Sequence, residues 1–455
     1  MKSLLNFLIE VGKLKKMPRT GWIWLGVKNP ETIAQHAFRV AIMSWILARE
    51  VEPKLNLGKI IKNSLVHDLC EVYAGDMTPY WGLLPQDAKK RRKTLKRWIR
   101  LTKKEKEKRD KIKFEKEKKS LQKLIKKLDR KLKKEIMDNW LDYEKLISRE
   151  GRFVKQVDKI ETLLQAKEYW KDTKGSPVFG WWEEISELVD NPVLLEFLEE
   201  VKKQNRGVDL KVSKLEFFAE INKLKQMPRT GLLFRGIKNP ETIGEQSFGT
   251  AIMTWVLGKR KRINMEKALK IALVHEICEV YSGDATPYDS ILPLPREELK
   301  EMFLNPSKFS KKKRERTYQL LHEMYKRWPK FSRKEKQRLF KKDYQDEKRA
   351  LEKLTSKLSK SLKEEIIGLW DDFKRQKSKE GKFVNQVYWL QTYFQTLQYL
   401  KENRQFPIRP WREQMIHFID DSSLLELFKE MEEKFYPHPQ KLADLRKKLS
   451  FLGFN

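Results

Sequence analysis

The feature that most constrains this chain is an internal repeat. Residues 17 to 36 read MPRTGWIWLGVKNPETIAQH, and residues 227 to 246 read MPRTGLLFRGIKNPETIGEQ, an offset of 227 − 17 = 210. The block LVHDLCEVYAGDMTPY from Leu65 returns as LVHEICEVYSGDATPY from Leu273, an offset of 273 − 65 = 208. Two such matches in the same order do not arise by chance. The 455-residue chain is therefore expected to hold two related domains of ordinary size.

A third block, ending in EGRFVKQVDKIETLLQA at Ala166, recurs as EGKFVNQVYWLQTYFQT ending at Thr396, an offset of 396 − 166 = 230. The larger offset places a longer insertion in the second copy. We predict a first copy, a second copy and a C-terminal tail that has no counterpart in the first copy. Their predicted bounds are residues 1–205, 206–435 and 436–455.

An all-α fold of two tandem helical domains is expected. Lys, Glu, Leu and Arg dominate, whereas the chain has only 19 Gly and 18 Pro, and this composition favours helices. Apolar periodicity and capping residues predict three helices that carry candidate site residues. They are one capped at Asn29 and running to about Arg49, one from Ile60 to Val72 that closes near Gly75, and one through residues 153 to 164.

Basic segments separate the second block from the third, at about residues 86–134 and 300–360. The formal net charge of +34 leaves weak binding to nucleic acid open, but a lysine-rich solvated surface explains it as well. We expect both segments to be exposed, mobile helical insertions. Their aromatic residues are expected to pin them to the body rather than stack on bases. These are Trp98, Phe114, Tyr325 and Trp328.

A cytoplasmic protein is expected. The first apolar stretch is broken by Glu10 and Lys13, unlike a signal peptide, and no run of about eighteen apolar residues predicts a membrane span. The two cysteines, Cys70 and Cys278, are too few for a disulfide framework or a cysteine zinc site.

Two histidines and two aspartates of the first copy form the pattern H…HD…D: His36, the pair His67 and Asp68, and Asp158. An unpaired Asp158 among apolar neighbours would be costly, and a bound cation removes that cost. Imidazole with carboxylate suits manganese, cobalt, iron or zinc, with magnesium also kept open, and leaves coordination positions for water and phosphate. The pattern resembles the HD-domain metal-dependent phosphohydrolases. The MPRTGW, HDxxEVxxGDxTP and EGRFVKQxDK segments resemble their 5′-deoxynucleotidase branch.

The resemblance implies an all-α domain in which these four residues bind one divalent metal ion and deoxynucleoside 5′-monophosphates are the substrates. It also implies that Glu71 manages the proton of the attacking water and that Asp76 is a second acid/base or positioning carboxylate; a turn carboxylate bonded to backbone amides is the alternative for Asp76. Arg19 is a candidate clamp for the phosphate. Trp22 is a candidate contact for the sugar or base, with core packing as its alternative.

The second copy lacks three of the four ligands. The residues at the positions of His36, Asp68 and Asp158 are Gln246, Glu276 and Tyr388, respectively. Only His67 has an identical counterpart, His275. Arg229, Glu279 and Asp284 are kept at the positions of Arg19, Glu71 and Asp76. One metal ion per chain is therefore expected, with a second copy that is structural or regulatory.

Two alternatives remain at this stage. One is a nucleotide- or nucleic-acid-binding protein that uses the HD fold as a scaffold, and the other is an HD hydrolase of a different phosphorylated nucleotide. Related single-domain enzymes resemble obligate dimers, which predicts that the two copies form an intramolecular pseudo-dimer.

Overall fold

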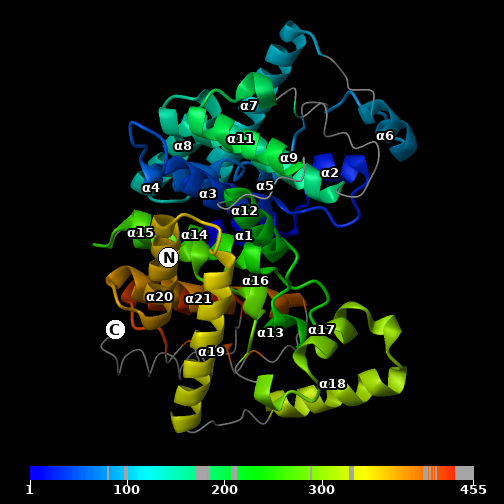
Figure 1. Ribbon diagram of the computed structural model, residues 1–455, viewed down its shortest axis with the longest axis vertical. Coiled ribbons are helices and arrows are strands. Elements are labelled where there is room, and N and C mark those ends of the chain that lie inside the picture. Colours follow the sequence, from blue (N-terminus) through cyan, green and yellow to red (C-terminus); the bar gives the residue numbers. More distant parts are fainter. Residues whose placement is uncertain are drawn as a thin grey trace. The chain divides into compact units, whose positions relative to one another are not determined.

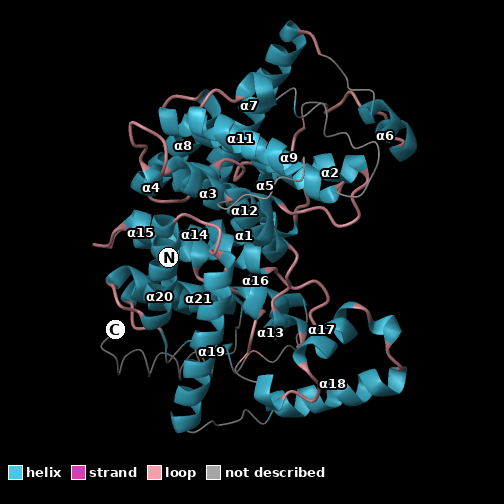
Figure 2. Cartoon of the chain, viewed as in Figure 1, coloured by secondary structure: helices cyan, strands magenta, loops and turns pink. Residues whose placement is uncertain are grey.

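The computed structural model describes residues 1–78, 81–96, 101–170, 182, 185–205, 213–259, 261–286, 289–326, 333–402, 408, 411–412, 415 and 418–435. Within these ranges the regular elements are helices (Figure 2). Two isolated β-bridges pair Pro18 with Thr32 and Pro228 with Thr242. The predicted all-α class is confirmed. None of the helices in the described ranges is both long and apolar enough to cross a membrane.

The chain divides into two compact units (Figure 1). One comprises residues 6–219 and 265–269, and the other comprises residues 1–5, 220–264 and 270–455. The predicted boundary after residue 205 adjoins residues 206–212, and these lie outside the described residues, as does the predicted tail 436–455.

The helices of the first copy are α1 (Lys2–Gly12), η1 (Lys13–Lys16), α2 (Thr20–Leu25), α3 (Ile33–Ala48), α4 (Leu57–Val66), α5 (Glu71–Ala74), α6 (Ala88–Lys96), α7 (Lys103–Ile125), α8 (Arg130–Lys145), α9 (Arg149–Tyr169) and α11 (Pro192–Asn205). Those of the second copy are α12 (Lys214–Asn222), η2 (Lys223–Lys225), α13 (Thr230–Leu233), α14 (Ile243–Gly258), α15 (Met265–Val274), α16 (Glu279–Ser282), η3 (Asp289–Ile291), α17 (Arg296–Leu304), η4 (Pro306–Lys308), α18 (Lys311–Lys326), α19 (Arg333–Leu354), α20 (Lys360–Arg375), α21 (Lys379–Glu402) and α23 (Ser422–Phe435).

Helix α3 is the central element of the first copy. Every one of its residues is buried, and it packs against α4 and α9. A helix that is buried on all sides must be surrounded by other elements. In the second copy α14 takes the same place and packs against α21. Polar side chains on α3 are therefore held in a desolvated interior, where they need partners.

Helix α3 begins later than predicted. Thr32, rather than Asn29, is the N-cap and forms a reciprocal capping box with Gln35. The residues before it are extended, because the Arg19 amide donates a hydrogen bond to the Glu31 carbonyl at 2.9 Å. This pairing keeps residues 29–31 out of the helix and fixes the Arg19 turn beside the start of α3.

The helix that carries the HD pair ends earlier than predicted. Helix α4 stops at Val66, and His67 is its C-cap. The chain then turns tightly, since the Leu69 amide bonds to the Val66 carbonyl at 3.0 Å and the Glu71 amide to the Asp68 carbonyl at 3.1 Å. The prediction that His67 and Asp68 lie within one continuous helix is therefore wrong. Both residues lie in the tight turn that follows α4.

Part of the predicted basic insertion is built into the body of the first copy. In the second half of α7, Leu121, Leu124 and Ile125 recur at helical spacing and are at most 6% exposed. The prediction of an exposed, mobile helix is wrong for this half. Phe114 stacks on Trp140 with ring centroids 5.4 Å apart, so its predicted pinning role is confirmed. Trp98 and Trp328, and the side chain of Tyr325, lie outside the described residues.

The repeat extends further upstream than the sequence comparison indicated. The segment from Glu117 to Leu124 in α7 matches Glu347 to Leu354 in α19 at the same offset, 347 − 117 = 230. Helix α7 packs on α5, and α19 packs on α16. Tyr344 stacks on Trp370 at 5.1 Å, the counterpart of the pair formed by Phe114. These helices belong to the repeated domain.

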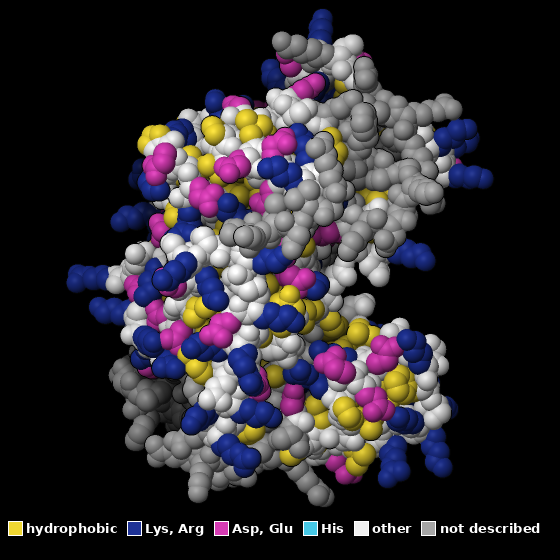
Figure 3. All heavy atoms as spheres, viewed as in Figure 1, with side chains coloured by type: hydrophobic (Ala, Val, Ile, Leu, Met, Phe, Trp, Pro, Cys, Tyr) yellow, Lys and Arg dark blue, Asp and Glu magenta, His cyan; other side chains and the backbone are white. Residues whose placement is uncertain are grey.

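Basic side chains are spread over the visible face rather than gathered on it (Figure 3). Lysine and arginine alternate there with aspartate and glutamate. Local ion pairs between described side chains, such as Lys134 with Asp138 at 2.6 Å and Lys313 with Glu298 at 2.6 Å, offset part of the positive charge of the chain. The visible face therefore has no single stripe of positive charge, and binding to nucleic acid stays an untested prediction.

Candidate metal centre

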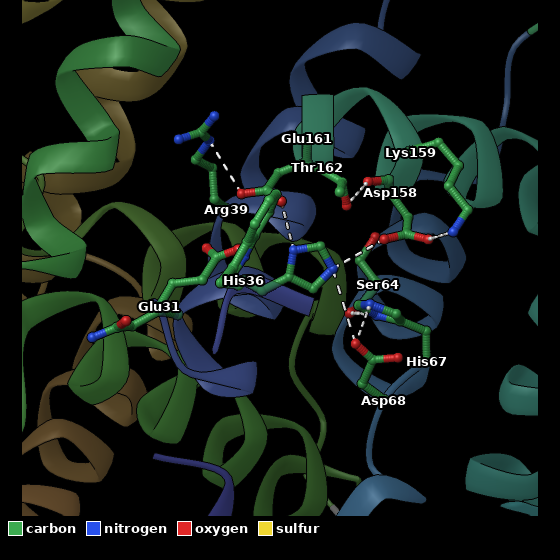
Figure 4. A network of polar contacts seen from close by, with 12 residues as sticks. Glu31, His36, Arg39, Ser64, His67, Asp68, Asp158, Lys159, Glu161 and Thr162 are labelled. Atoms are coloured by element: carbon green, nitrogen blue, oxygen red, sulfur yellow. Dashed lines mark hydrogen bonds and ion pairs between the residues drawn. The ribbon is translucent and has the colours of Figure 1, made fainter. Parts of the chain in front are cut away.

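His36, on the first turn of α3, is oriented by a carboxylate behind it. The side chain is fully buried, and Nδ1 lies 2.5 Å from Oε2 of Glu161, to which it donates a hydrogen bond. The other ring nitrogen, Nε2, faces Oδ1 of Asp158 at 3.0 Å (Figure 4). Burial and Arg19 oppose protonation of His36, but Glu161 and Asp158 outweigh them and raise its pKa to about 9. The site thus favours positive charge at Nε2.

His67 is oriented by the backbone. Its Nδ1 donates a hydrogen bond to the Ser64 carbonyl at 2.7 Å, which leaves the lone pair on Nε2. Within the described part of the chain this buried Nε2 has no hydrogen-bond partner, although Oδ2 of Asp68 lies 3.1 Å away. Two acceptors then face each other, and a proton or a cation between them removes the conflict.

The two aspartates complete the group. Oδ2 of Asp158 accepts a hydrogen bond from the Tyr143 hydroxyl at 2.9 Å, and Oδ2 of Asp68 lies 3.9 Å from Nε2 of His36. Burial alone would raise the pKa of both carboxyls. Interactions with neighbouring side chains, of which Lys159 is the largest for Asp158 and His67 the largest for Asp68, hold each pKa below its usual value.

The sequence-predicted ligands therefore converge. One ligand atom each from His36, His67 and Asp158 lie within 4.8 Å of one another, and Asp68 reaches both imidazoles (Figure 4). Both histidines present Nε2 to the centre and use Nδ1 for a supporting hydrogen bond, as metal-bound histidines do. The donor set suits a borderline divalent ion.

Sequence reasoning missed three residues that support these ligands. Glu161 is fully buried, accepts a hydrogen bond from Nδ1 of His36 and lies 3.4 Å from Nε of the buried Arg39. Tyr143 holds Asp158, as described above. The comparison of the two copies carried the signal, because all three supporting residues change together with the ligands. The counterparts of Arg39, Tyr143 and Glu161 in the second copy are Gly249, Phe373 and Gln391, respectively.

Arg19 lies close to the candidate ligands. Burial opposes its charge, but Glu31 and the nearby carboxylates of Asp76, Asp68 and Asp158 raise the pKa of the guanidinium. Its Nη1 is buried and makes no hydrogen bond to any described residue. A permanently charged group with an unused donor is suited to an anionic oxygen.

Glu71 and Asp76 occupy different surroundings. Glu71 begins α5 and is 5% exposed, and burial followed by Asp68 and Asp76 raises its pKa well above the usual value. Oδ2 of Asp76 instead accepts a hydrogen bond from the Thr20 amide at 2.6 Å. That contact caps the start of α2 from 56 residues away in the sequence, whereas the alternative predicted for Asp76 was a bond to amides near it in its own turn.

Trp22 is not brought into the cluster. It is 3% exposed, donates from Nε1 to Oε1 of Glu31 at 2.9 Å, and packs edge-on against Tyr169 with centroids 5.3 Å apart. In the second copy its place is taken by Leu232, which is 2% exposed. A buried aliphatic residue at the matching position is what core packing, the alternative for Trp22, requires.

Comparison with known proteins identifies the family of the chain. The family described as HD domain matches residues 11–186, 221–346 and 334–422. The chain belongs to the HD domain family. The matches recur along the chain, which confirms the tandem arrangement of HD domains.

Curated relatives carry the name 5′-deoxynucleotidase. The HDDC2 protein of Homo sapiens is 30% identical over 203 residues, which cover 44% of this chain and 85% of that protein. A 5′-deoxynucleotidase of Saccharomyces cerevisiae is 35% identical over 176 residues, covering 39% of this chain and 64% of that protein. A solved structure of a conserved hypothetical protein from Pyrococcus furiosus is 26% identical, with a TM-score of 0.32, covering 44% of this chain and 98% of that chain.

The second HD domain has replaced the candidate metal centre with an internal cation. Nη1 of Arg229 pairs with Oε1 of Glu276 at 2.5 Å, and Nη2 donates to the Tyr388 hydroxyl at 3.0 Å. Glu276 and Tyr388 stand at the positions of two ligands of the first copy. Glu276 is one methylene longer than Asp68, its counterpart, and reaches the guanidinium of Arg229. In the first copy, Nη1 of Arg19 has no hydrogen-bond partner among the described residues.

The histidine that the second HD domain keeps at the position of His67 is held neutral. His275 keeps the backbone contact of its counterpart, with Nδ1 2.8 Å from the Ala272 carbonyl. Burial, together with Arg229 and Lys374, lowers its pKa to about 3. In the described residues, the groups of three or more residues able to hold a metal ion all lie in the first copy.

Proposed function

We propose that the first HD domain binds one divalent metal ion through His36, His67, Asp68 and Asp158 and hydrolyses deoxynucleoside 5′-monophosphates to a nucleoside and phosphate. The observation that carries this proposal is the convergence of two buried imidazole Nε2 atoms with two carboxylates. Membership of the HD domain family and relatives named 5′-deoxynucleotidase support the reaction and the substrate class.

When bound, the metal ion would polarise the phosphate ester and acidify a coordinated water. The chain's own residues then have separate tasks. Arg19, with its unbonded Nη1, holds a phosphate oxygen. Glu71 receives a proton from the attacking water and passes one to the leaving oxygen, a task that suits a carboxyl whose pKa is raised by burial.

The supporting residues fix the form of the ligands. Glu161 keeps the proton of His36 on Nδ1, Arg39 holds Glu161 in place, and Tyr143 orients Asp158. We assign Asp76 a positioning role, since its bond to the Thr20 amide fixes the turn that presents Arg19. Trp22 supports the same region from the core through Glu31.

The second HD domain is proposed to be structural or regulatory. Its Arg229 guanidinium bonds to Glu276 and Tyr388, which stand at two of the four candidate ligand positions, so hydrolysis by this domain is not expected.

The activity is tested with dAMP, dGMP, dCMP, dTMP and dUMP, each assayed for phosphate release with manganese, cobalt, iron, zinc or magnesium. His67→Ala and Asp68→Ala should each abolish turnover, whereas His275→Ala, the matched change in the second copy, should leave it intact. Full activity in His67→Ala, or equal loss in His275→Ala, would sink the assignment. Ribonucleotides and other phosphorylated nucleotides in the same assay define the substrate class.

A further inference from the structure

The second copy keeps a cavity at the place of its lost centre. The cavity measures about 350 Å³ and lies beside Arg229, Glu276 and Tyr388. Sites for small organic molecules span roughly 300–1,000 Å³, so this volume admits a small ligand. The Arg229 pair occupies one wall and does not fill the space.

Carboxylates outnumber cations around this cavity. Among its described lining residues there are five acidic side chains, namely Glu276, Glu279, Asp284, Asp343 and Glu347, and three basic ones, namely Arg229, Arg235 and Lys374. Counted formally, 3 − 5 leaves an excess of two negative charges. Two of the cations are already paired, Arg229 with Glu276 at 2.5 Å and Lys374 with Glu347 at 2.5 Å. Asp284 also lies 3.6 Å from Nε of Arg229, so Arg229 is shared between two carboxylates. Glu279 and Asp343 have no ion pair with a described residue of this wall.

Two of the acidic side chains present unused acceptors. Oε2 of Glu279 and Oε2 of Glu276 are buried and make no hydrogen bond to a described residue, and the two residues are 9% and 4% exposed. A buried acceptor without a donor is costly. A ligand that brings N–H or O–H groups into the cavity would remove this cost.

Aromatic rings form much of the remaining wall. Trp389 packs edge-on against Tyr388 at 5.2 Å and stacks on Phe418 at 5.0 Å. The guanidinium of Arg235 already lies over the Trp411 ring, 4.9 Å from its centroid. The wall is therefore of a kind that attracts positive charge through the ring faces.

These features select among ligand classes. An anionic nucleotide would add negative charge to a cavity with surplus acid. A metal ion is disfavoured because the acid groups form no ligand cluster of the kind found around His36 in the described residues. A quaternary ammonium group lacks the donors that Glu276 and Glu279 require. A primary or secondary ammonium group supplies charge, donors and aliphatic surface together.

We propose that the cavity of the second copy binds an aliphatic di- or polyamine. The ammonium group bonds to Glu279 and Glu276, and the methylene chain lies against Tyr388 and Trp389. This site is separate from the proposed metal centre, and binding to it does not depend on hydrolysis. Because the whole chain carries a formal charge of +34, loose binding of amines to its surface is disfavoured.

The experiment is calorimetric titration of the full chain with putrescine and with spermidine. We expect saturable binding of one amine per chain. Glu279→Gln, which keeps the shape of the side chain, should weaken binding by about 10-fold or more, as expected for loss of a charge-assisted hydrogen bond. Trp389→Lys, which introduces the residue found at Lys159 of the first copy, should weaken it further. Glu71→Gln, the matched change in the first copy, should leave affinity unchanged.

Several outcomes would overturn the proposal. They are the absence of saturable binding, equal binding by wild type and Glu279→Gln, and loss of binding in Glu71→Gln instead. Displacement of the amine by an equal concentration of dAMP would assign the cavity to a nucleotide. Thermal melting of each variant checks folding, and Glu279→Gln decides the question alone if Trp389→Lys does not fold.

Discussion

Three of the four proposed ligands of the first copy depend on a second group that fixes their chemical form. His36 depends on the Glu161 side chain and Asp158 on the Tyr143 hydroxyl, whereas His67 depends on a backbone carbonyl. In the second copy the two side-chain supports are gone, but the backbone contact persists at His275. The carbonyl is supplied by Ser64 in the first copy and by Ala272 in the second. The contact is kept because every residue type has a backbone carbonyl, so the side chain at that position can change.

Glu161→Gln should lower the affinity for manganese or zinc by about 10- to 100-fold, the usual effect of losing such a support. The reason is that an amide does not hold the proton of His36 on Nδ1 as a carboxylate does. Metal affinity is measured by competition with a chelating dye, which needs no turnover. The reverse change in the second copy, Gln391→Glu, is the matched control and should leave affinity unchanged. Unaltered affinity in Glu161→Gln would contradict the role.

Asp76 and Asp284 make the same bond in the two copies, to the Thr20 and Thr230 amides at 2.6 Å each. Asp76→Ala and Asp284→Ala should therefore each reduce the free energy of unfolding of their own unit by about 1–2 kcal/mol, as loss of a helix cap does. Urea denaturation of the two variants measures this. A cost in only one copy would show that the bond does not explain why both residues are kept.

Residue types and order were enough to predict which four side chains lie together as candidate ligands, but not their supports. The sequence placed His36, His67, Asp68 and Asp158 together through a family pattern, and the structure brings them together. Glu161 lies 125 residues from His36, and only the packing of α9 on α3 joins the two. For Trp22 the sequence left two roles open, because residue type alone cannot distinguish a tryptophan in the core from one that contacts a ligand.

At the scale of elements, periodicity predicted which helices exist better than where they end. The end of α4 was missed because the apolar pattern continues through Leu69 and Val72 while hydrogen bonding changes at His67. The start of α3 was missed because both Asn29 and Thr32 are good caps, and the bridge from Pro18 to Thr32 decides between them. Long-range pairing thus overrode local preference.

Helices α7 and α19 carry a glutamate at matching positions, Glu117 and Glu347, and the lysine that pairs with it comes from a different helix in each copy. In the first copy Lys113 of α7 lies 3.5 Å from Glu117, and Glu144 of α8 is nearby. In the second copy, aspartate and lysine replace Lys113 and Glu144, respectively. The lysine, Lys374, lies 2.5 Å from Glu347. The cation has moved from one helix to its neighbour while the glutamate keeps a partner.

Lys113→Asp alone should destabilise the first copy, by about 1–3 kcal/mol, because it places a third carboxylate beside Glu117 and Glu144. Adding Glu144→Lys and Lys155→Asn, which copies the charges of the second copy, should recover most of the loss. Lys155 is included because it pairs with Glu144 at 3.4 Å and would repel a lysine there. Denaturation of single, double and triple variants gives the coupling. Additive effects would show that the groups do not interact.

At the scale of the whole molecule, the two HD domains are expected to differ in metal content. Elemental analysis of the full chain should give one divalent ion per chain. The count should fall to zero in a His67→Ala, Asp68→Ala double variant and stay at one in His275→Ala. Two ions per chain, or an ion retained by the double variant, would contradict the proposed site. The predicted intramolecular pseudo-dimer is a separate matter that this count does not address.

The ion pair between Arg229 and Glu276 also affects whether the second copy could acquire the four candidate ligands of the first copy. Evolution proceeds by single substitutions, and Glu276→Asp would withdraw the carboxylate from Arg229 while Gln246 and Tyr388 still prevent coordination. Breaking a buried ion pair typically costs about 3–5 kcal/mol, so the first backward step is penalised before any benefit arises. A stepwise return to the ligand set of the first copy is therefore expected to be disfavoured.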